Sequence, residues 1–480
     1  MDSHLDTPSH SRVWPAIKWT LAVPILLCGV FVLAVGVRYV VGKGRLDRLQ
    51  PLRDDGLTLH FQQVVPDWMR DWLGDRCEPL ERISDVELMP ADDQSLIRVL
   101  PNTPDAESVE LWIDGDSAIS GAGLSELARL PGLKRLTIEG DIAHVDLSWL
   151  PKCQKLEVLS VSIMATDAEG EFPTRNREWC KLLTGLSHLR DLTVFDDGVL
   201  TRHEASTLAS IPSLRKVKLN SIPWDDDDEV TDETISWSMA LKSLTAESLR
   251  PLAAIPNLQS LDFECEDLSS SVTDSLSRFP SLRSLTVRNA LLTDVTLRGI
   301  AACPQLESLT LVASPVSPPD GFGVLAECPP LHQLIVRDDE IGPDYLPGIA
   351  RITQLRSLRI EHLGDGIQGL PQLKSLVKLE ELDLKSDEPI DEIIDATASM
   401  PALHWLRFKT LPRPDHPLEL KLATGTIPPS LTHEVDTTIR EMRLQLRIDK
   451  DKPAEPTEYS IGERKLLPPD PQRNGFFCFF

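Results

Sequence analysis

The chain has 480 residues, a formal net charge of −25 at pH 7 and a sequence pI near 4.8. This acidic balance argues against a nucleic-acid-binding protein and favours basic or cationic partners. The 8 cysteines form no CxxC pair and show no regular spacing, so a disulfide scaffold is not predicted.

Residues 1–18 form an N-terminal tail, and the segment that follows it carries no charge between Thr20 and Val37. A run of this length can cross the hydrocarbon core, and the Lys, Trp, Arg and Tyr residues that flank it suit the membrane interface. We therefore predict one transmembrane helix over residues 19–41. The alternative is a cleaved signal peptide, for which Ala34-Val35-Gly36 offers small residues at a cleavage site.

The basic residues on the two sides of this helix are unevenly distributed. Two precede it and five follow it soon after: Arg12 and Lys18, then Arg38, Lys43, Arg45, Arg48 and Arg53. Because positive charge collects on the cytoplasmic side, the asymmetry predicts a single-pass membrane protein with a cytoplasmic C-terminal domain.

Residues 42–119 are predicted to form a juxtamembrane segment and an N-terminal cap. The stretch "PDWMRDWLG" reads as a short helix with Pro66 and Asp67 as its start signals. Apolar residues then alternate with polar ones around Val86 and Val109, which is typical of short strands.

Residues 120–411 repeat one pattern with a period close to 24 residues. A leucine marks each of eleven units: Leu133, Leu156, Leu189, Leu214, Leu258, Leu282, Leu306, Leu331, Leu355, Leu379 and Leu403. An apolar residue stands three positions before each of these leucines. One such unit cannot bury its apolar side alone, whereas stacked neighbours can.

The stretches "PSLRSLTV", "PQLESLTL", "TQLRSLRI" and "VKLEELDL" resemble the LxxLxL core of leucine-rich repeats. The resemblance implies an α/β solenoid, a leucine-rich repeat horseshoe of about eleven repeats of ~24 residues. It would place a parallel sheet on one face and helices on the other. The chain resembles single-pass membrane-anchored bacterial proteins of this kind. The resemblance concerns the fold and names no ligand.

Many leucine-rich repeats continue with an asparagine that satisfies backbone groups of the turn. Here the corresponding positions are Asp141, Met164, Asp197, Ile222, Glu266, Ala290, Ser314, Asp339, Leu363, Asp387 and Leu411. No asparagine ladder is therefore predicted, and the strand-to-helix edge is expected to be irregular.

Two intervals between the marker leucines are longer than the rest, at 33 and 44 residues. The extra residues follow Val161 and Leu219, so both insertions are expected at the strand-to-helix edge. They bring together candidate partner-binding residues: Asp167, Glu169, Glu171, Asp196, Asp197, Trp224, Asp225, Asp226, Asp227, Asp228 and Glu229. The favoured interpretation of these residues is a solvated acidic loop, because a bare run of like charges tends to stay disordered. The functional alternative is a site for a basic protein segment, with Trp224 as an apolar anchor. A divalent-cation site is less favoured.

Trp405 is a further candidate, because it lies at an outward strand position and aromatic residues anchor interfaces. Packing under the C-terminal cap is the competing explanation. That cap is predicted over residues 412–448, where "MRLQLRI" reads as a last strand. Residues 449–480 read as a disordered tail.

The chain lacks the GxGxxG, GxxxxGK[ST], HExxH and GxSxG signatures, so neither an enzyme nor a cofactor nor a metal site is predicted. The favoured function is a membrane-anchored scaffold for protein–protein interaction, with no nucleic-acid partner. The alternative from another class is an exported ligand-sensing domain for envelope peptide or carbohydrate, which requires the opposite topology. An enzyme with an unrecognised site on the inserted loops is a third hypothesis.

Overall fold

The computed structural model describes the chain from residue 13 to residue 448 with gaps at 54–55, 114–116, 141, 143–144, 163–178, 196–199, 221–245, 266–267, 269, 338–340, 362, 364, 386–399, 401, 404, 411–430 and 439–440. Within these limits the side chains of residues 13–28, 75, 220, 246, 270–271, 273, 365–368, 385 and 404–448 are not described. The chain divides into two compact units, Met1–Glu264 and Cys265–Phe480, and each is considered by itself.

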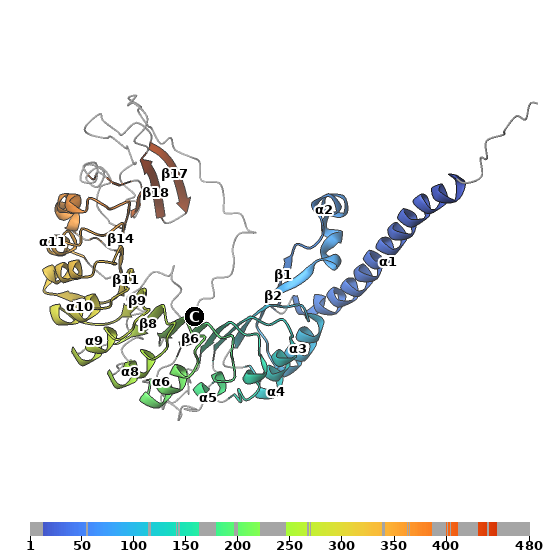
Figure 1. Cartoon of the computed structure of the whole chain (residues 1–480), viewed down its shortest axis with the longest axis horizontal. Coiled ribbons are helices and arrows are strands. Elements are labelled where there is room, and N and C mark those ends of the chain that lie inside the picture. The colour runs from blue at the N-terminus through green and yellow to red at the C-terminus, as the bar shows by residue number, and fades with distance from the viewer. Residues whose placement is uncertain are drawn as a thin grey trace, which may run out of the picture. The chain divides into compact units, whose positions relative to one another are not determined.

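The first unit begins with one long helix and continues as an alternation of short strands and short helices (Figure 1). Its α-helices are α1 (Val13–Arg53), α2 (Asp67–Leu73), α3 (Asp93–Val99), α4 (Gly121–Leu124), α5 (Trp179–Leu183), α6 (Arg202–Ala209) and α8 (Ala246–Leu252). Its 3-10 helices are η1 (Gly74–Leu80), η2 (Leu100–Asn102), η3 (Ser125–Arg129) and η4 (Leu150–Lys152). Its strands are β1 (Thr58–Gln62), β2 (Arg82–Leu88), β3 (Ser108–Ile113), β4 (Arg135–Gly140), β5 (Val158–Ser162), β6 (Asp191–Phe195), β7 (Lys216–Asn220) and β8 (Ser260–Glu264).

The strands of the first unit lie side by side in chain order, with β1 antiparallel to β2 and each later strand parallel to the one before it. The longer intervals do not disturb the register, because Leu159 pairs with Leu192 and Val217 pairs with Leu261. Both insertions therefore begin where a strand ends and finish where a helix begins, as the repeat spacing predicts. The parallel sheet also extends through β2 and β3, before residue 120.

The second unit continues the same alternation. Its helices are α9 (Ser270–Leu276), α10 (Asp294–Ala301), η6 (Pro319–Glu327), η7 (Pro343–Tyr345), α11 (Leu346–Ile349) and η8 (Asp365–Ser375). Its strands are β9 (Ser284–Arg288), β10 (Leu292–Thr293), β11 (Ser308–Val312), β12 (Val316–Ser317), β13 (Gln333–Arg337), β14 (Ser357–Glu361), β15 (Glu381–Lys385), β16 (Trp405–Thr410), β17 (Leu431–Thr438) and β18 (Glu441–Ile448).

In the second unit β9, β11, β13, β14, β15 and β16 form a parallel sheet, and β18 and β17 add to it antiparallel. Leu309 pairs with Leu285 on one side and with Leu334 on the other, so each strand neighbour is one repeat away in the sequence. Helix α10 starts at a capping box in which Thr293 and Thr296 each bond the other's backbone N–H. The strand β11 follows this helix and contains the alternate leucines Leu309 and Leu311, both buried, as the repeat pattern predicts.

The core of both units consists of the residues that repeat. All eleven marker leucines are buried, and so are the apolar residues three positions before them. Three of those positions are cysteines, Cys153, Cys303 and Cys328, which fill the core as small apolar groups. Burial raises the pKa of Cys153 to about 11 and that of Cys303 to about 12, so these thiols stay protonated and unreactive at neutral pH.

Helix α1 runs through the predicted transmembrane segment without a break. In the part of the chain that the structure describes, no helix has both the length and the apolar character that crossing a bilayer requires. The side chains of residues 13–28, which include the N-terminal part of the predicted span, lie outside that part. The transmembrane helix therefore stays a prediction.

The C-terminal half of α1 is docked on the start of the first unit. Leu49 is fully buried there, and Gly42 lies so close to the Pro79 carbonyl of η1 that no side chain fits between them. Arg48 donates a hydrogen bond to Asn102, with Nη1 and Oδ1 3.0 Å apart. Arg45 and Arg53 form ion pairs with Asp105 and Glu78, at 3.6 and 3.9 Å. Three of the five charges that suggested the membrane topology thus have partners in the fold.

Ser314 occupies one of the positions at which many leucine-rich repeats have an asparagine, and it shows how the turn is satisfied without one. Ser314 is buried, and its hydroxyl accepts a hydrogen bond from the Ala290 N–H at 3.1 Å and donates to the Val312 carbonyl at 2.8 Å. The strand-to-helix edge beside it is irregular, since Asn289 and Ala313 have φ values of 52° and 45°.

We expect Ser314→Ala to lower the free energy of unfolding by about 1–3 kcal/mol, because it leaves the buried Ala290 N–H without this acceptor. Urea denaturation of the full chain measures the change. Ser308→Ala is the matched control, since the Ser308 hydroxyl bonds Gln333 on the solvent side of the sheet. Equal effects of the two substitutions would contradict a role for Ser314 in the turn.

Candidate functional site: an acidic and aromatic patch on the first strands

The strands of the first unit present two different faces. Alternate residues such as Val86, Val109 and Leu136 are buried, and their neighbours in the sequence point to the opposite side. We call this second side the open face. The strand register places Glu87 beside Glu110, Glu110 beside Thr137, and Trp112 beside Glu139.

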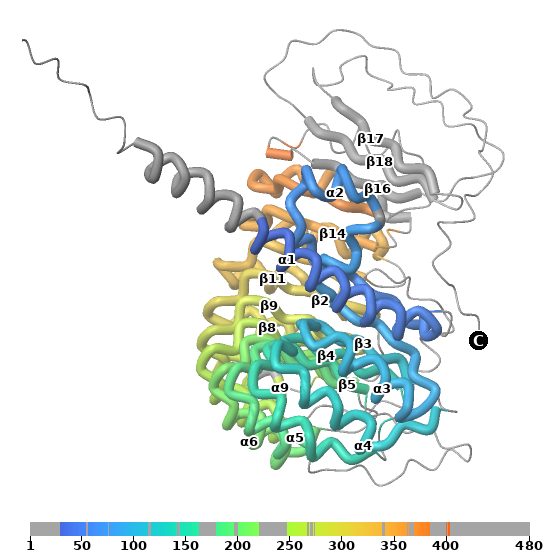
Figure 2. The backbone as a smooth tube through the Cα atoms, turned by 90° about the vertical axis from the view of Figure 1, so that its right-hand side faces the viewer, coloured from blue at the N-terminus to red at the C-terminus, as the bar shows by residue number. Residues whose placement is uncertain are grey.

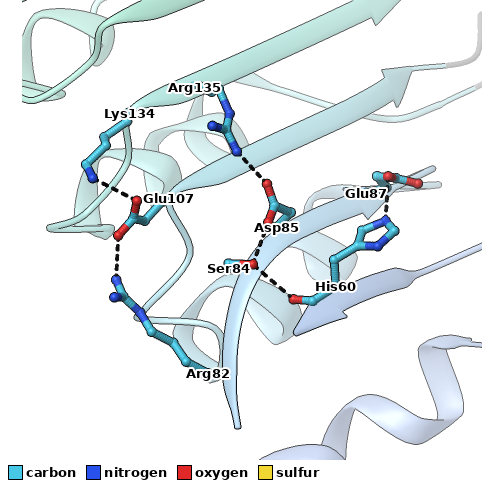
Figure 3. A network of polar contacts seen from close by, with 8 residues as sticks. All are labelled: His60, Arg82, Ser84, Asp85, Glu87, Glu107, Lys134 and Arg135. Atoms are coloured by element: carbon cyan, nitrogen blue, oxygen red, sulfur yellow. Dashed lines mark hydrogen bonds and ion pairs between the residues drawn. The ribbon is translucent and has the colours of Figure 1, made fainter. Parts of the chain in front are cut away.

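Ion pairs connect neighbouring repeats at the N-terminal ends of these strands (Figure 3). Glu107 accepts hydrogen bonds from Arg82 at 2.8 Å and from Lys134 at 2.7 Å, and Arg135 reaches Asp85 at 2.7 Å. Equivalent pairs recur further along the chain, between Arg190 and Glu157 and, in the second unit, between Arg356 and Glu380. Because this arrangement repeats with the fold, we assign it a structural role.

The carboxylates of these pairs are well compensated. The hydrogen bond from Lys134 is the main reason that the pKa of Glu107 lies below its ordinary value. Burial raises the pKa of Asp85, but hydrogen bonds from Ser84 and Arg135 outweigh it, so that this pKa is also lowered. Both groups are ionised at neutral pH and have a cation beside them, which leaves them little to offer a ligand.

Glu110 is in a different situation. Burial is the main cause that raises its pKa, and the negative charge of Glu87 on the next strand raises it further. The Trp112 indole N–H donates to Glu110 and His60 lies nearby, but neither contact fully offsets the two causes. Among the described residues, the ion pairs formed by Arg and Lys do not include Glu110. A positive charge placed here would stabilise the ionised form of Glu110.

The residues around Glu110 complete a small patch. His60 comes from the antiparallel strand β1, and its Nε2 lies 2.7 Å from Glu87 Oε1 (Figure 3). Trp112 is 42% exposed on the same face, although most large apolar side chains of these strands are buried. We refer to His60, Glu87, Glu110 and Trp112 as the Trp112 patch. Carboxylates beside an exposed indole ring form a suitable site for a guanidinium or ammonium group.

In the second unit we likewise call the side of the sheet opposite the buried leucines the open face. Its acidic side chains are compensated by arginines to a greater extent than those of the first unit. Arg337 and Arg359 both reach Glu361, at 3.0 and 2.8 Å, and Arg359 also lies 3.9 Å from Asp383. The angle between Arg337 and Glu361 does not suit a hydrogen bond, so the contact is an ion pair only. These acidic residues already have cations on neighbouring strands, which makes this face a weaker candidate.

A groove of about 720 Å³ runs between α1 and the start of the first unit. Apolar residues such as Leu33, Val37 and Phe61 form part of its lining, together with Arg38 and Glu81. Because it lies along the helix whose membrane insertion is predicted, we do not assign it a separate ligand. In the described part of the chain, no group of three or more His, Cys, Asp or Glu side chains is arranged to hold a metal ion.

The candidate residues of the sequence analysis fall where the structure does not describe side chains. Asp167, Glu169, Glu171, Asp196, Asp197, Trp224, Asp225, Asp226, Asp227, Asp228 and Glu229 all lie outside the described residues. Trp405 begins β16, and its backbone pairs with that of Glu381, but its side chain is not described. A role for these residues in binding a partner therefore stays a prediction.

Sequence reasoning did not identify the Trp112 patch. The alternation of apolar residues around Val86 and Val109 is typical of short strands and by itself names no site. The residues that alternate with the apolar ones include Glu87, Glu110 and Trp112, which this pattern directs to the opposite face. The sequence therefore indicates that these residues face outward. It does not indicate the strand register that makes the two glutamates neighbours.

Comparisons with known proteins provide no functional assignment. No protein-family model matches the chain, and no curated protein matches it either. Among solved structures, an internalin (inlF) from Listeria monocytogenes is similar, with 16% sequence identity and a TM-score of 0.36 over 67% of this chain and 84% of that one. The repeat solenoid described above rests on the strand registers of this chain and not on that likeness.

Proposed function

We propose that the chain is a membrane-anchored scaffold for protein–protein interaction, and that its Trp112 patch binds a basic segment of a partner protein. The observation that carries the proposal is the exposed Trp112 ring on the same face as Glu87 and Glu110, which the strand register makes neighbours. Two adjacent carboxylates repel each other, and a bound Arg or Lys side chain relieves that repulsion. The chain's net charge of −25 would attract such a partner over longer distances.

The membrane anchor is supported by the sequence of α1. Its residues 20–37 carry no charge, and its C-terminal half is held on the first unit by Gly42, Leu49 and three arginines. An apolar segment that continues as one helix into a docked segment would hold the repeats close to the bilayer. A repeat solenoid provides an extended surface for binding and needs no reaction chemistry of its own.

The patch can be tested with a fluorescently labelled arginine-rich peptide, titrated with the detergent-solubilised full chain and followed by fluorescence anisotropy. We expect the double substitution Glu87→Gln with Glu110→Gln to weaken binding by about tenfold or more, and Trp112→Ala to weaken it by several fold. Binding should decrease as salt is added, because the attraction is electrostatic.

The pH dependence follows from the raised pKa of Glu110. A bound cation favours the ionised carboxylate, so binding releases a proton at pH values near that pKa. Affinity is therefore expected to fall as the pH is lowered, and to begin falling at a higher pH than an ordinary glutamate would allow. The Glu110→Gln variant should lose this part of the pH dependence.

The control removes two charges from the helical side of the first and second units, by Glu247→Gln with Asp274→Asn, both of which are exposed. It should change the affinity by less than about twofold, since distant surface charges are screened. A third variant replaces Asp225 to Glu229 with serine. Loss of binding in that variant alone, with the patch variants unchanged, would reject the Trp112 patch and favour the inserted loop.

A further inference from the structure

Helix α2 exposes two tryptophan side chains. Trp68 is 64% and Trp72 is 79% exposed, and their spacing of four residues places them on one side of the helix. A third residue of α2, Met69, is buried in a small cluster with Val65 and Leu80. The helix is therefore held by a different side from the one that carries the two indole rings.

The same cluster holds α2 against α1. Val35 and Tyr39 of α1 pack on Val65, Met69 and Leu80. Figure 2 shows α2 next to this part of α1, which is the beginning of the segment with described side chains. Helix α2 therefore lies at the level of residues 35–39 of α1.

That level coincides with the end of the uncharged run. The run ends at Val37, and Arg38 is the first charged residue after it. Residues 35–39 span about 6 Å along a helix at ~1.5 Å per residue. If α1 crosses a bilayer, this level is the headgroup region, where tryptophan and tyrosine are enriched because their rings are apolar and their polar atoms remain hydrated.

Val32 and Leu33 of α1 are 67% and 68% exposed, so the predicted span also presents large apolar side chains at the surface. The charges of α2 do not favour anionic lipid, since Asp67 and Asp71 are exposed while Arg70 is paired with Glu81 at 3.1 Å. The aromatic rings are thus the groups through which α2 could contact a membrane.

We infer that α2 is an interfacial anchor, whose Trp68 and Trp72 rings insert into the headgroup region of the bilayer that α1 crosses. This inference rests on the membrane anchor of the proposed function. It adds a second contact between the protein and the lipid surface. Because α1 and α2 are packed together, the two contacts would hold the first unit at one orientation to the membrane instead of allowing it to swing on a single helix.

The test uses the full chain reconstituted into vesicles of zwitterionic phosphatidylcholine, part of which is brominated near the headgroup end of its acyl chains. Bromine quenches the fluorescence of nearby tryptophan. We expect Trp68→Phe with Trp72→Phe to remove about half of the quenching, because Trp14 and Trp19 beside the apolar run remain in place. The control, Trp112→Phe, removes an indole from the open face and should leave the quenching unchanged.

Flotation of the same vesicles separates the two proposals. If the chain floats with the lipid and the double variant is quenched as strongly as the wild type, α2 does not touch the membrane and the inference is wrong, although the anchor stands. If the chain does not float, both the anchor and the inference fail. If Trp68 and Trp72 instead mediate self-association, so that only the double variant is monomeric in nanodiscs, the rings face a second copy and the inference is again rejected.

Discussion

Leu309→Asp is expected to lower the free energy of unfolding of the repeat array by about 4 kcal/mol or more. Leu309 is fully buried in β11 between Leu285 and Leu334 of the neighbouring strands. The substitution removes a core side chain and places a carboxylate where neither water nor a cation can reach it. Because each repeat is stabilised mainly by its neighbours, the loss is expected to spread to the adjacent repeats.

Thr310→Asp is the matched control one residue further on. Thr310 lies on the open face, half-exposed, so the same new charge should cost less than about 1 kcal/mol. Urea denaturation followed by circular dichroism measures both variants. If the two substitutions destabilised the protein equally, the assignment of buried and open faces in the second unit would be incorrect.

Gly42→Val is expected to detach the C-terminal half of α1 from the first unit. A Cβ atom at residue 42 would overlap the carbonyl oxygen of Pro79. Both atoms are attached directly to the backbone, so neither can move aside easily. Detachment would expose Leu49 and Leu52, each of which contributes about 2 kcal/mol through its burial. Hydrogen exchange of residues 42–53 in the detergent-solubilised full chain should accelerate strongly.

Gly44→Val separates this packing effect from helix propensity. Both glycines lie in α1, so valine changes the intrinsic helix preference in the same way at each. At residue 44, however, the nearest atom that a Cβ would meet is the end of the Arg48 side chain at 4.0 Å. Unchanged exchange in Gly42→Val, or equal acceleration in both variants, would show that α1 is not held at Gly42.

Much of the fold could be predicted because its determinants are local and periodic. The leucine spacing of about 24 residues identified the strands, the buried positions and the neighbours of each strand, and the registers of Leu285, Leu309 and Leu334 confirm it. The positions of both insertions followed from the same alignment. A repeat makes such inferences reliable, since each unit contacts only the units before and after it.

The candidate site was less accessible to sequence reasoning, because it depends on residues that are far apart in the chain. Glu87 and Glu110 are separated by 23 residues, and only the parallel register of β2 and β3 makes them neighbours. His60 reaches Glu87 from a strand that runs in the opposite direction. Continuous acidic runs such as Asp225 to Glu229 are, by contrast, conspicuous in the sequence whether or not they form a surface.

The sequence by itself determined that apolar side chains recur at a spacing that only stacked strands can bury, and that an uncharged run of helix precedes them. Both properties depend only on the order of residues along the chain, because the preference of apolar side chains to leave water is a property of each residue type. The tertiary structure alone decided which carboxylates lie beside a cation and which do not. Glu107 is paired and Glu110 is not, although both flank or occupy the same strand, because electrostatic energy depends on distances in space between residues of different repeats.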